Sequence, residues 1–121
     1  LLAESEAFTR LSDYQRMWLE SYLEPQEFPA GAEILGNGER LAGIHIVIDG
    51  TASADDGNGR SGTVGRGQTI GVLHQIMRDE PARFSFTTSE PLRTLYLSRS
   101  DALELLDRNP GLAMKITSPL S

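Results

Sequence analysis

The sequence predicts a mainly β fold, a jelly-roll or β-roll sandwich flanked by N-terminal and C-terminal α-helices. Three observations lead to this prediction. Helical periodicity is strongest towards the two ends of the chain, and period-2 alternation of apolar residues prevails in the middle. Gly, Pro, Asn and Asp cut the middle into seven or eight short runs. Short strands at close spacing between helices are typical of sandwich and jelly-roll folds.

A helix is expected over residues 11–23. Ser12 and Gln15 have the spacing of a capping box, and Pro25 is expected to end the helix. Apolar residues recur between them at helical spacing, namely Leu11, Tyr14, Trp18 and Tyr22. This apolar stripe must face a core, so we expect the helix to pack on the outside of the strands.

The strands are expected to form a β-roll from about Glu27 to Leu97. In GIHIVIDG, strict alternation places Ile44, Ile46 and Ile48 on one buried face. Two dipeptides that tolerate positive φ, Asp56-Gly57 and Asn58-Gly59, predict a tight hairpin tip. Two further strands follow in RFSFTTSEPLRTLYL, with a break near Glu90-Pro91.

Helical periodicity returns after the last strand. SRSDALELLDRNP predicts a helix capped by Ser98 or Ser100 and ended by Asn109-Pro110, and GLAMKIT predicts the start of another helix. We therefore expect one domain over residues 1–121. It divides into an N-terminal helical part (1–24), a β-roll (25–97) and C-terminal helices (98–121).

Composition argues against several functions. A net charge of -6 is unfavourable for binding duplex DNA or an anionic membrane, since both require clustered cations. The chain has no cysteine and no apolar run of membrane-spanning length, and we expect a cytoplasmic protein. His45 and His74 belong to no catalytic or metal-binding pattern, and Asp55-Asp56 lacks the remaining ligands of a calcium loop. We predict that the domain is not an enzyme.

One stretch, GQTIGVLHQIMRDEPARFSF, has the features of an anion site. Gly71 is expected to open a short helix whose first N–H groups stay free, and Arg83 follows about twelve residues later. Backbone donors and an arginine that close over one spot would attract an anion. An ordinary connection with a surface arginine explains the same residues, and the two interpretations stay open at this point.

In order and spacing, four stretches of the chain resemble the cyclic nucleotide-binding domain family, the jelly-roll module of catabolite activator proteins, cyclic-nucleotide-dependent kinases and gated channels. FPAGAEILGNGE is similar to the opening strands and HIVIDG to the strand that ends in glycine. RGQTIGVL with PARFSF resembles the phosphate-binding cassette, which we place at residues 67–85. LYLSRSDALELLDRNPGLA is similar to the strand and helix that follow the cassette.

The resemblance implies cyclic AMP or cyclic GMP as the ligand, with no other cofactor, but two positions depart from the family. Its cassettes have Gly-Glu, whose carboxylate accepts the ribose 2′-hydroxyl, and an arginine followed by a small or hydroxylated residue, which holds the phosphate. Here the pairs are Gly71-Val72 and Arg83-Phe84. The candidate ligand-binding residues are Gly71, Val72, Leu73, Arg83, Phe84 and Ser85. His74 and Gln75 are expected to be solvated.

Two hypotheses follow. In the first, the chain is a regulatory module of a larger protein, since it opens on Leu1, and its eroded pocket binds cyclic nucleotide weakly or with altered specificity. An effector domain would lie in the same full-length chain, and residues after Arg99 would carry the signal to it. In the alternative, the chain is a ligand-independent interaction or oligomerisation domain. A homodimer is compatible with both hypotheses.

Overall fold

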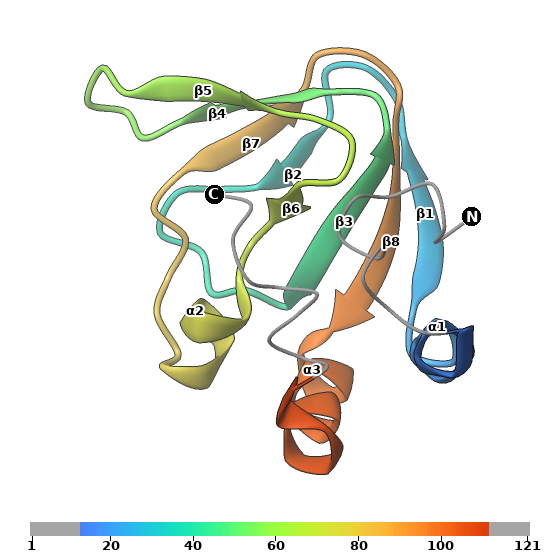
Figure 1. The fold of residues 1–121 in the computed structure, drawn as a ribbon. Helices are drawn as coiled ribbons and strands as arrows, with labels where there is room; N and C mark the ends of the chain where they lie inside the picture. Colours follow the sequence, from blue (N-terminus) through green and yellow to red (C-terminus); the bar gives the residue numbers. More distant parts are fainter. Residues whose placement is uncertain (1–12, 112–121) are drawn as a thin grey trace.

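The computed structural model describes residues 13–111, which form two four-stranded antiparallel sheets with helices at one end (Figure 1). The strand orders are β1-β8-β3-β6 and β2-β7-β4-β5. The elements in chain order are α1 (Asp13–Glu20), β1 (Glu24–Phe28), β2 (Glu33–Leu35), β3 (Gly43–Asp49), β4 (Ala52–Asp55), β5 (Ser61–Val64), β6 (Thr69–Ile70), α2 (Leu73–Met77), β7 (Ser85–Thr88), β8 (Leu92–Ser98) and α3 (Arg99–Arg108). The predicted mainly β sandwich with flanking helices is confirmed.

Strand β3 is covered on both faces, because its alternating side chains enter two separate clusters. Ile44 and Ile46 are fully buried in a cluster with residues of all three labelled helices, and Val47 is fully buried in a second cluster of strand residues. The expectation of a single buried face was therefore incomplete. Ile48 is only half-buried, because the register of β3 against β8 shifts between Val47 and Asp49.

The N-terminal helix ends earlier than predicted. Helix α1 stops at Glu20, and Pro25 lies inside β1 rather than at the end of the helix. Strand β1 is an edge strand that pairs only with β8 within its sheet, a position that tolerates the missing N–H of proline. Leu19, which the predicted apolar stripe did not include, anchors α1 with no exposed surface. Ser12 lies outside the described residues.

Elements defined by local chemistry match their predictions. The β4–β5 hairpin turns at residues 56–60, where Gly57 and Gly59 have positive φ and the Asp56 carboxylate accepts from the backbone N–H groups of Asn58 and Arg60. Helix α3 has Ser98 as its cap, with its hydroxyl accepting from the Asp101 N–H at 3.2 Å. Most of the helix predicted over residues 111–117 lies outside the described residues.

Candidate functional site

A cavity of about 900 Å³ lies between the β4–β5 hairpin and the cassette. The hairpin contributes residues 59–64, and the cassette contributes residues on both sides of α2. Strands β2 and β7 add Leu35 and Phe86 to the apolar part of the wall. The two segments with candidate residues, near 71 and near 83, therefore face one space although α2 separates them in sequence.

Four of the six candidate residues line this cavity: Gly71, Val72, Arg83 and Phe84. The other two do not line it. Leu73 has 2% of its surface exposed and packs in the core with the α2 residue Ile76, because helical geometry turns it away from the cavity. The Ser85 hydroxyl accepts a hydrogen bond from the Asn37 backbone N–H at 3.0 Å, so it fastens the neighbouring connection.

Gly71 allows the cassette to turn sharply into α2. Its φ is +89°, a conformation that L side chains rarely adopt, and a Cβ atom at this position would lie 2.8 Å from Leu41 Cδ2. The helix that follows has only five residues. Glycine is therefore required at this position both for the turn and for the close approach to Leu41.

The amide of Val72, the N-cap residue of α2, already has a partner. The Val72 N–H donates to Gln75 Oε1 at 3.2 Å, so this one of the N–H groups that were expected to be free is not free. Gln75 bends back to the N-terminal end of its own helix and is half-buried, contrary to the expectation that it is solvated. His74 is exposed, as expected, and both residues line the cavity.

Arg83 points its guanidinium at a carboxylate of its own chain. Nη2 lies 3.4 Å from Glu80 Oε2, and the Arg83 side chain is 77% exposed while that of Glu80 is 27% exposed. Two more nitrogen-bearing side chains lie near Glu80: its Oε1 is 4.0 Å from the Arg78 guanidinium nitrogen Nη1 and 3.9 Å from His74 Nε2. Glu80 is therefore the central anion of this wall of the cavity.

Sequence reasoning missed Glu80 and Arg60, both of which line the cavity. Glu80 could have been found, because an acidic residue three positions before the candidate arginine is within ion-pair reach. Arg60 could not have been placed there from local sequence, because only the pairing of β4 with β7 brings the hairpin over the cassette.

Part of the remaining wall is apolar, although Ser61, Thr63 and Thr69 also line the cavity. Phe84 and Phe86 lie with ring centroids 6.3 Å apart, and Val72 and Val64 also line the cavity. Neither Val72 nor Phe84 has a side-chain hydrogen-bonding group. The cavity thus combines cationic groups at one place with an apolar surface beside them.

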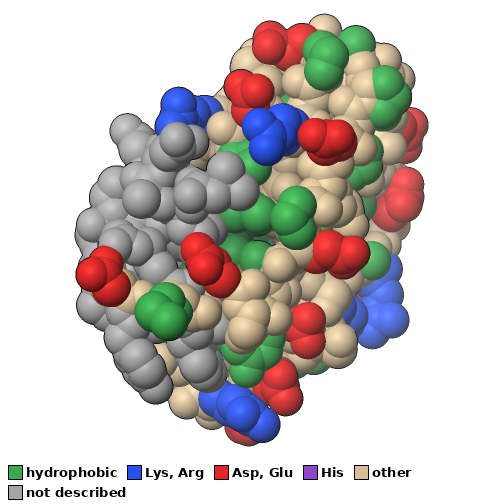
Figure 2. Space-filling view, turned by 90° about the vertical axis from the view of Figure 1, so that its right-hand side faces the viewer, with side chains coloured by type: hydrophobic (Ala, Val, Ile, Leu, Met, Phe, Trp, Pro, Cys, Tyr) green, Lys and Arg blue, Asp and Glu red, His purple; other side chains and the backbone are tan. Residues whose placement is uncertain are grey.

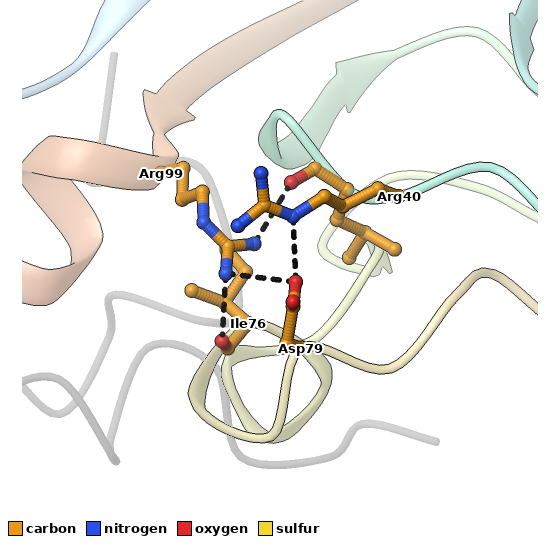
Figure 3. Close-up of polar contacts among 5 residues, drawn as sticks. Arg40, Ile76, Asp79 and Arg99 are labelled. Atoms are coloured by element: carbon orange, nitrogen blue, oxygen red, sulfur yellow. Dashed lines mark hydrogen bonds and ion pairs between the residues drawn. The ribbon is translucent and has the colours of Figure 1, made fainter.

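An arginine at the start of α3 connects that helix to the cassette (Figure 3). Arg99 donates to the Leu41 carbonyl oxygen at 3.3 Å, to the Ile76 carbonyl oxygen at 3.4 Å and to Asp79 Oδ1 at 3.1 Å. Arg40 Nε donates to the same Asp79 oxygen at 2.6 Å. The hydrogen bond from Arg40 is the largest cause that lowers the pKa of Asp79, and Arg99 lowers it further. Arg99 therefore links α3 to the C-terminal end of α2 and to the β2–β3 connection.

We expect Arg99→Leu to lower the free energy of unfolding by about 1–2 kcal/mol. The carbonyl oxygens of Leu41 and Ile76 lose the Arg99 donor and Asp79 loses one of its two, while the aliphatic packing is largely retained. Arg108→Leu is the matched control in the same helix. Arg108 contacts Glu104 at 3.6 Å in an exposed i,i+4 pair, so we expect its replacement to cost about 0.5 kcal/mol or less. Urea unfolding of the two variants measures the difference. Equal losses in both variants would contradict the link that we assign to Arg99.

Other chemistry has little support among residues 13–111. His45 Nδ1 and Thr94 Oγ1 lie 3.1 Å apart, but Thr94 is fully buried, so no substrate reaches this pair. In the same residues, no three His, Cys, Asp or Glu side chains are placed to hold a metal ion, and no helix is long and apolar enough to cross a membrane. On the face shown in Figure 2, acidic side chains are widespread and Lys and Arg do not gather into a patch.

Comparisons with known proteins agree with the fold described above. The family model described as cyclic nucleotide-binding domain matches residues 25–109. No curated protein sequence matches the chain. Similar solved structures include a cyclic nucleotide-binding domain from Methylobacillus flagellatus, with 23% identity and a TM-score of 0.75, where the similarity covers 95% of this chain and 67% of the other.

Two longer proteins contain the same fold. The catabolite activator protein of Thermus thermophilus has 22% identity and a TM-score of 0.77, and the similarity covers 93% of this chain and 55% of the other. The cAMP-bound PfPKA-R has 23% identity and a TM-score of 0.76, and the similarity covers 95% of this chain and 43% of the other. The chain therefore spans about half the length of these two proteins.

Proposed function

The chain belongs to the cyclic nucleotide-binding domain family, and from this premise we propose that it is a regulatory module whose cavity binds cyclic nucleotide weakly or with altered specificity. One observation carries the proposal. The cassette places Gly71, Val72, Arg83 and Phe84 around one cavity, with a cationic group retained and the ribose acceptor replaced by valine. Catalytic turnover is not part of this function.

The expected loss of affinity follows from Val72. A ribose hydroxyl that is buried against valine forgoes a charge-assisted hydrogen bond worth roughly 1.5–3 kcal/mol, or about 10- to 150-fold in affinity. Phe84 places a large apolar ring beside the expected phosphate position and adds no donor. Both residues therefore weaken nucleotide binding without removing Arg83.

Arg99 supplies a route from the cavity to the rest of a longer protein. Any ligand that pulls on the cassette also acts on Asp79 and on the Ile76 carbonyl oxygen, and both are bonded to Arg99. A shift there changes the position of α3, the element that leads towards the C-terminus. We propose that an effector domain of the full-length chain responds to this shift.

A ligand-independent interaction domain is the second candidate, and the state of Arg83 favours it. An arginine without a ligand to hold is expected to be exposed or paired with a nearby carboxylate. Arg83 is 77% exposed and pairs with Glu80. The two candidates differ in one measurable property, since only a domain that binds nucleotide in its folded state is stabilised by it.

We expect millimolar cyclic AMP or cyclic GMP to raise the melting temperature of the wild-type chain slightly, and Val72→Glu with Phe84→Ser to raise the affinity about 10-fold. The carboxylate restores the acceptor for the ribose hydroxyl, and the serine restores space and a hydrogen-bond donor. A gain in affinity of about 10-fold corresponds to the low end of the energy of one charge-assisted hydrogen bond. Val72→Glu alone should not restore tight binding, because Phe84 still fills the neighbouring volume.

Thermal shift and calorimetric titration of the wild type, both single variants and the double variant measure this effect. Val72→Gln with Phe84→Ser is the matched control, since it has the same shape without the charge and should gain less. If none of these variants is stabilised by either nucleotide while all of them stay folded, the ligand-independent domain is the correct function.

A further inference from the structure

We propose that Glu80 is a built-in competitor that occupies Arg83 and lowers the affinity of the cavity for anionic ligands, an inference that rests on the proposed function of the cavity. The observation is that the cationic clamp of the cavity is already paired with a carboxylate of the same wall. Arg83 Nη2 lies 3.4 Å from Glu80 Oε2, and both residues line the cavity. A phosphate that reaches Arg83 must displace this carboxylate or share the guanidinium with it.

The backbone holds Glu80 in this place. Its N–H donates to the Gln75 carbonyl oxygen at 2.8 Å, and Pro81, the next residue, restricts its conformation. The preceding residue, Asp79, has a φ of +54° and is held by Arg40 and Arg99. The Glu80 side chain is only 27% exposed, so the surrounding residues cover most of it.

The Glu80 carboxylate has other partners that remain when a ligand takes over Arg83. Its second carboxylate oxygen, which is not the one that contacts Arg83, lies 4.0 Å from Arg78 Nη1 and 3.9 Å from His74 Nε2. A ligand anion that takes over Arg83 leaves Glu80 beside Arg78, so no carboxylate loses all of its cationic partners. The exchange therefore lowers the affinity for an anion but does not block its entry.

The second anion-binding donor of the cassette is occupied in the same way. The Val72 N–H is bonded to Gln75 Oε1, so two donors on facing segments both have acceptors within the chain. A neutral ligand that fills only the apolar part of the cavity does not compete for Arg83. The arrangement thus penalises the phosphate of a nucleotide and leaves the binding of its base and sugar almost unaffected.

The test is a calorimetric titration of Glu80→Gln with cyclic AMP and, separately, with adenosine, which lacks the phosphate. We expect Glu80→Gln to raise the affinity for cyclic AMP about 3- to 10-fold, because it removes the exposed Glu80–Arg83 ion pair and the repulsion between the Glu80 carboxylate and the phosphate. The affinity for adenosine should change less than about 2-fold. In an Arg83→Ala background the same change should gain less than about 2-fold, because no guanidinium is released.

Glu27→Gln is the matched control, because Glu27 pairs with Arg93 at 3.6 Å on the opposite sheet and lines no part of the cavity. It should leave both affinities unchanged. A wild-type chain that binds cyclic AMP while Glu80→Gln binds it no more tightly overturns this inference alone. Binding by none of the variants, Val72→Glu with Phe84→Ser included, overturns the proposed function, and the role of Glu80 with it.

Discussion

Arg83→Ala is expected to lower the affinity for cyclic AMP by about 30- to 1000-fold, or roughly 2–4 kcal/mol, and to leave the fold intact. The loss is large because the guanidinium is the clamp for the phosphate in this account, and a methyl group cannot replace its paired donors. The fold should persist because Arg83 is 77% exposed and its contact with Glu80 is a surface ion pair.

The titration is best made in the Val72→Glu, Phe84→Ser background, where the starting affinity is higher and the loss can be measured. Arg93→Ala is the control, since Arg93 forms a comparable exposed pair with Glu27 away from the cavity and should bind as its parent does. Submicromolar binding by the wild type that Arg83→Ala does not change would place the ligand elsewhere on the domain.

Acid is expected to destabilise the domain by about 3 kcal/mol through His45 alone. Burial lowers the pKa of His45 from 6.5 to about 4, and its ring contacts the rings of Phe28 and Tyr96. Between pH 6.5 and 4 the unfolded chain takes up a proton at His45 that the folded chain does not. The contribution of neutral His45 is therefore complete above about pH 6.5 and is lost as the pH falls towards 4.

Urea unfolding at pH 7.5 and pH 4.5 measures this effect. Carboxylates titrate in the same range, so the relevant quantity is the difference between the wild type and His45→Gln, which retains a polar partner for Thr94. The variant should lose less stability on acidification than the wild type. Parallel losses in the two proteins would show that His45 does not remain neutral in the folded state.

Features that depend on adjacent residues could be predicted from the sequence. The Ser98 cap is set by its own hydroxyl and the third amide beyond it, and the hairpin at residues 56–60 is set by glycines and the Asp56 carboxylate. Gly71 was identified as the opening of a short helix for the same reason. Local chemistry fixes all three, whatever the rest of the fold does.

Features that depend on pairing between distant segments could not be predicted. Pro25 was expected to end a helix, but its pairing opposite Leu95 makes it part of an edge strand. Ile48 was expected to be buried but is only half-buried, because the register of β3 against β8 shifts beside it. The fold-back of Gln75 on Val72 was equally inaccessible, since nothing in the sequence indicates this hydrogen bond. The Glu80–Arg83 pair is different, because its spacing of three residues is visible in the sequence.

An amide NMR titration of the wild-type chain with cyclic AMP at fixed salt shows whether the cassette still receives a nucleotide. We expect saturating shifts at Gly71, Val72 and Arg83, where the cassette faces the cavity, and smaller shifts at Arg99, which carries the change into α3. The same titration of Arg83→Ala should give almost no shift. Saturating shifts confined to residues outside the cavity, or no shifts at millimolar nucleotide in a folded chain, would contradict the claim that this cassette still receives a nucleotide.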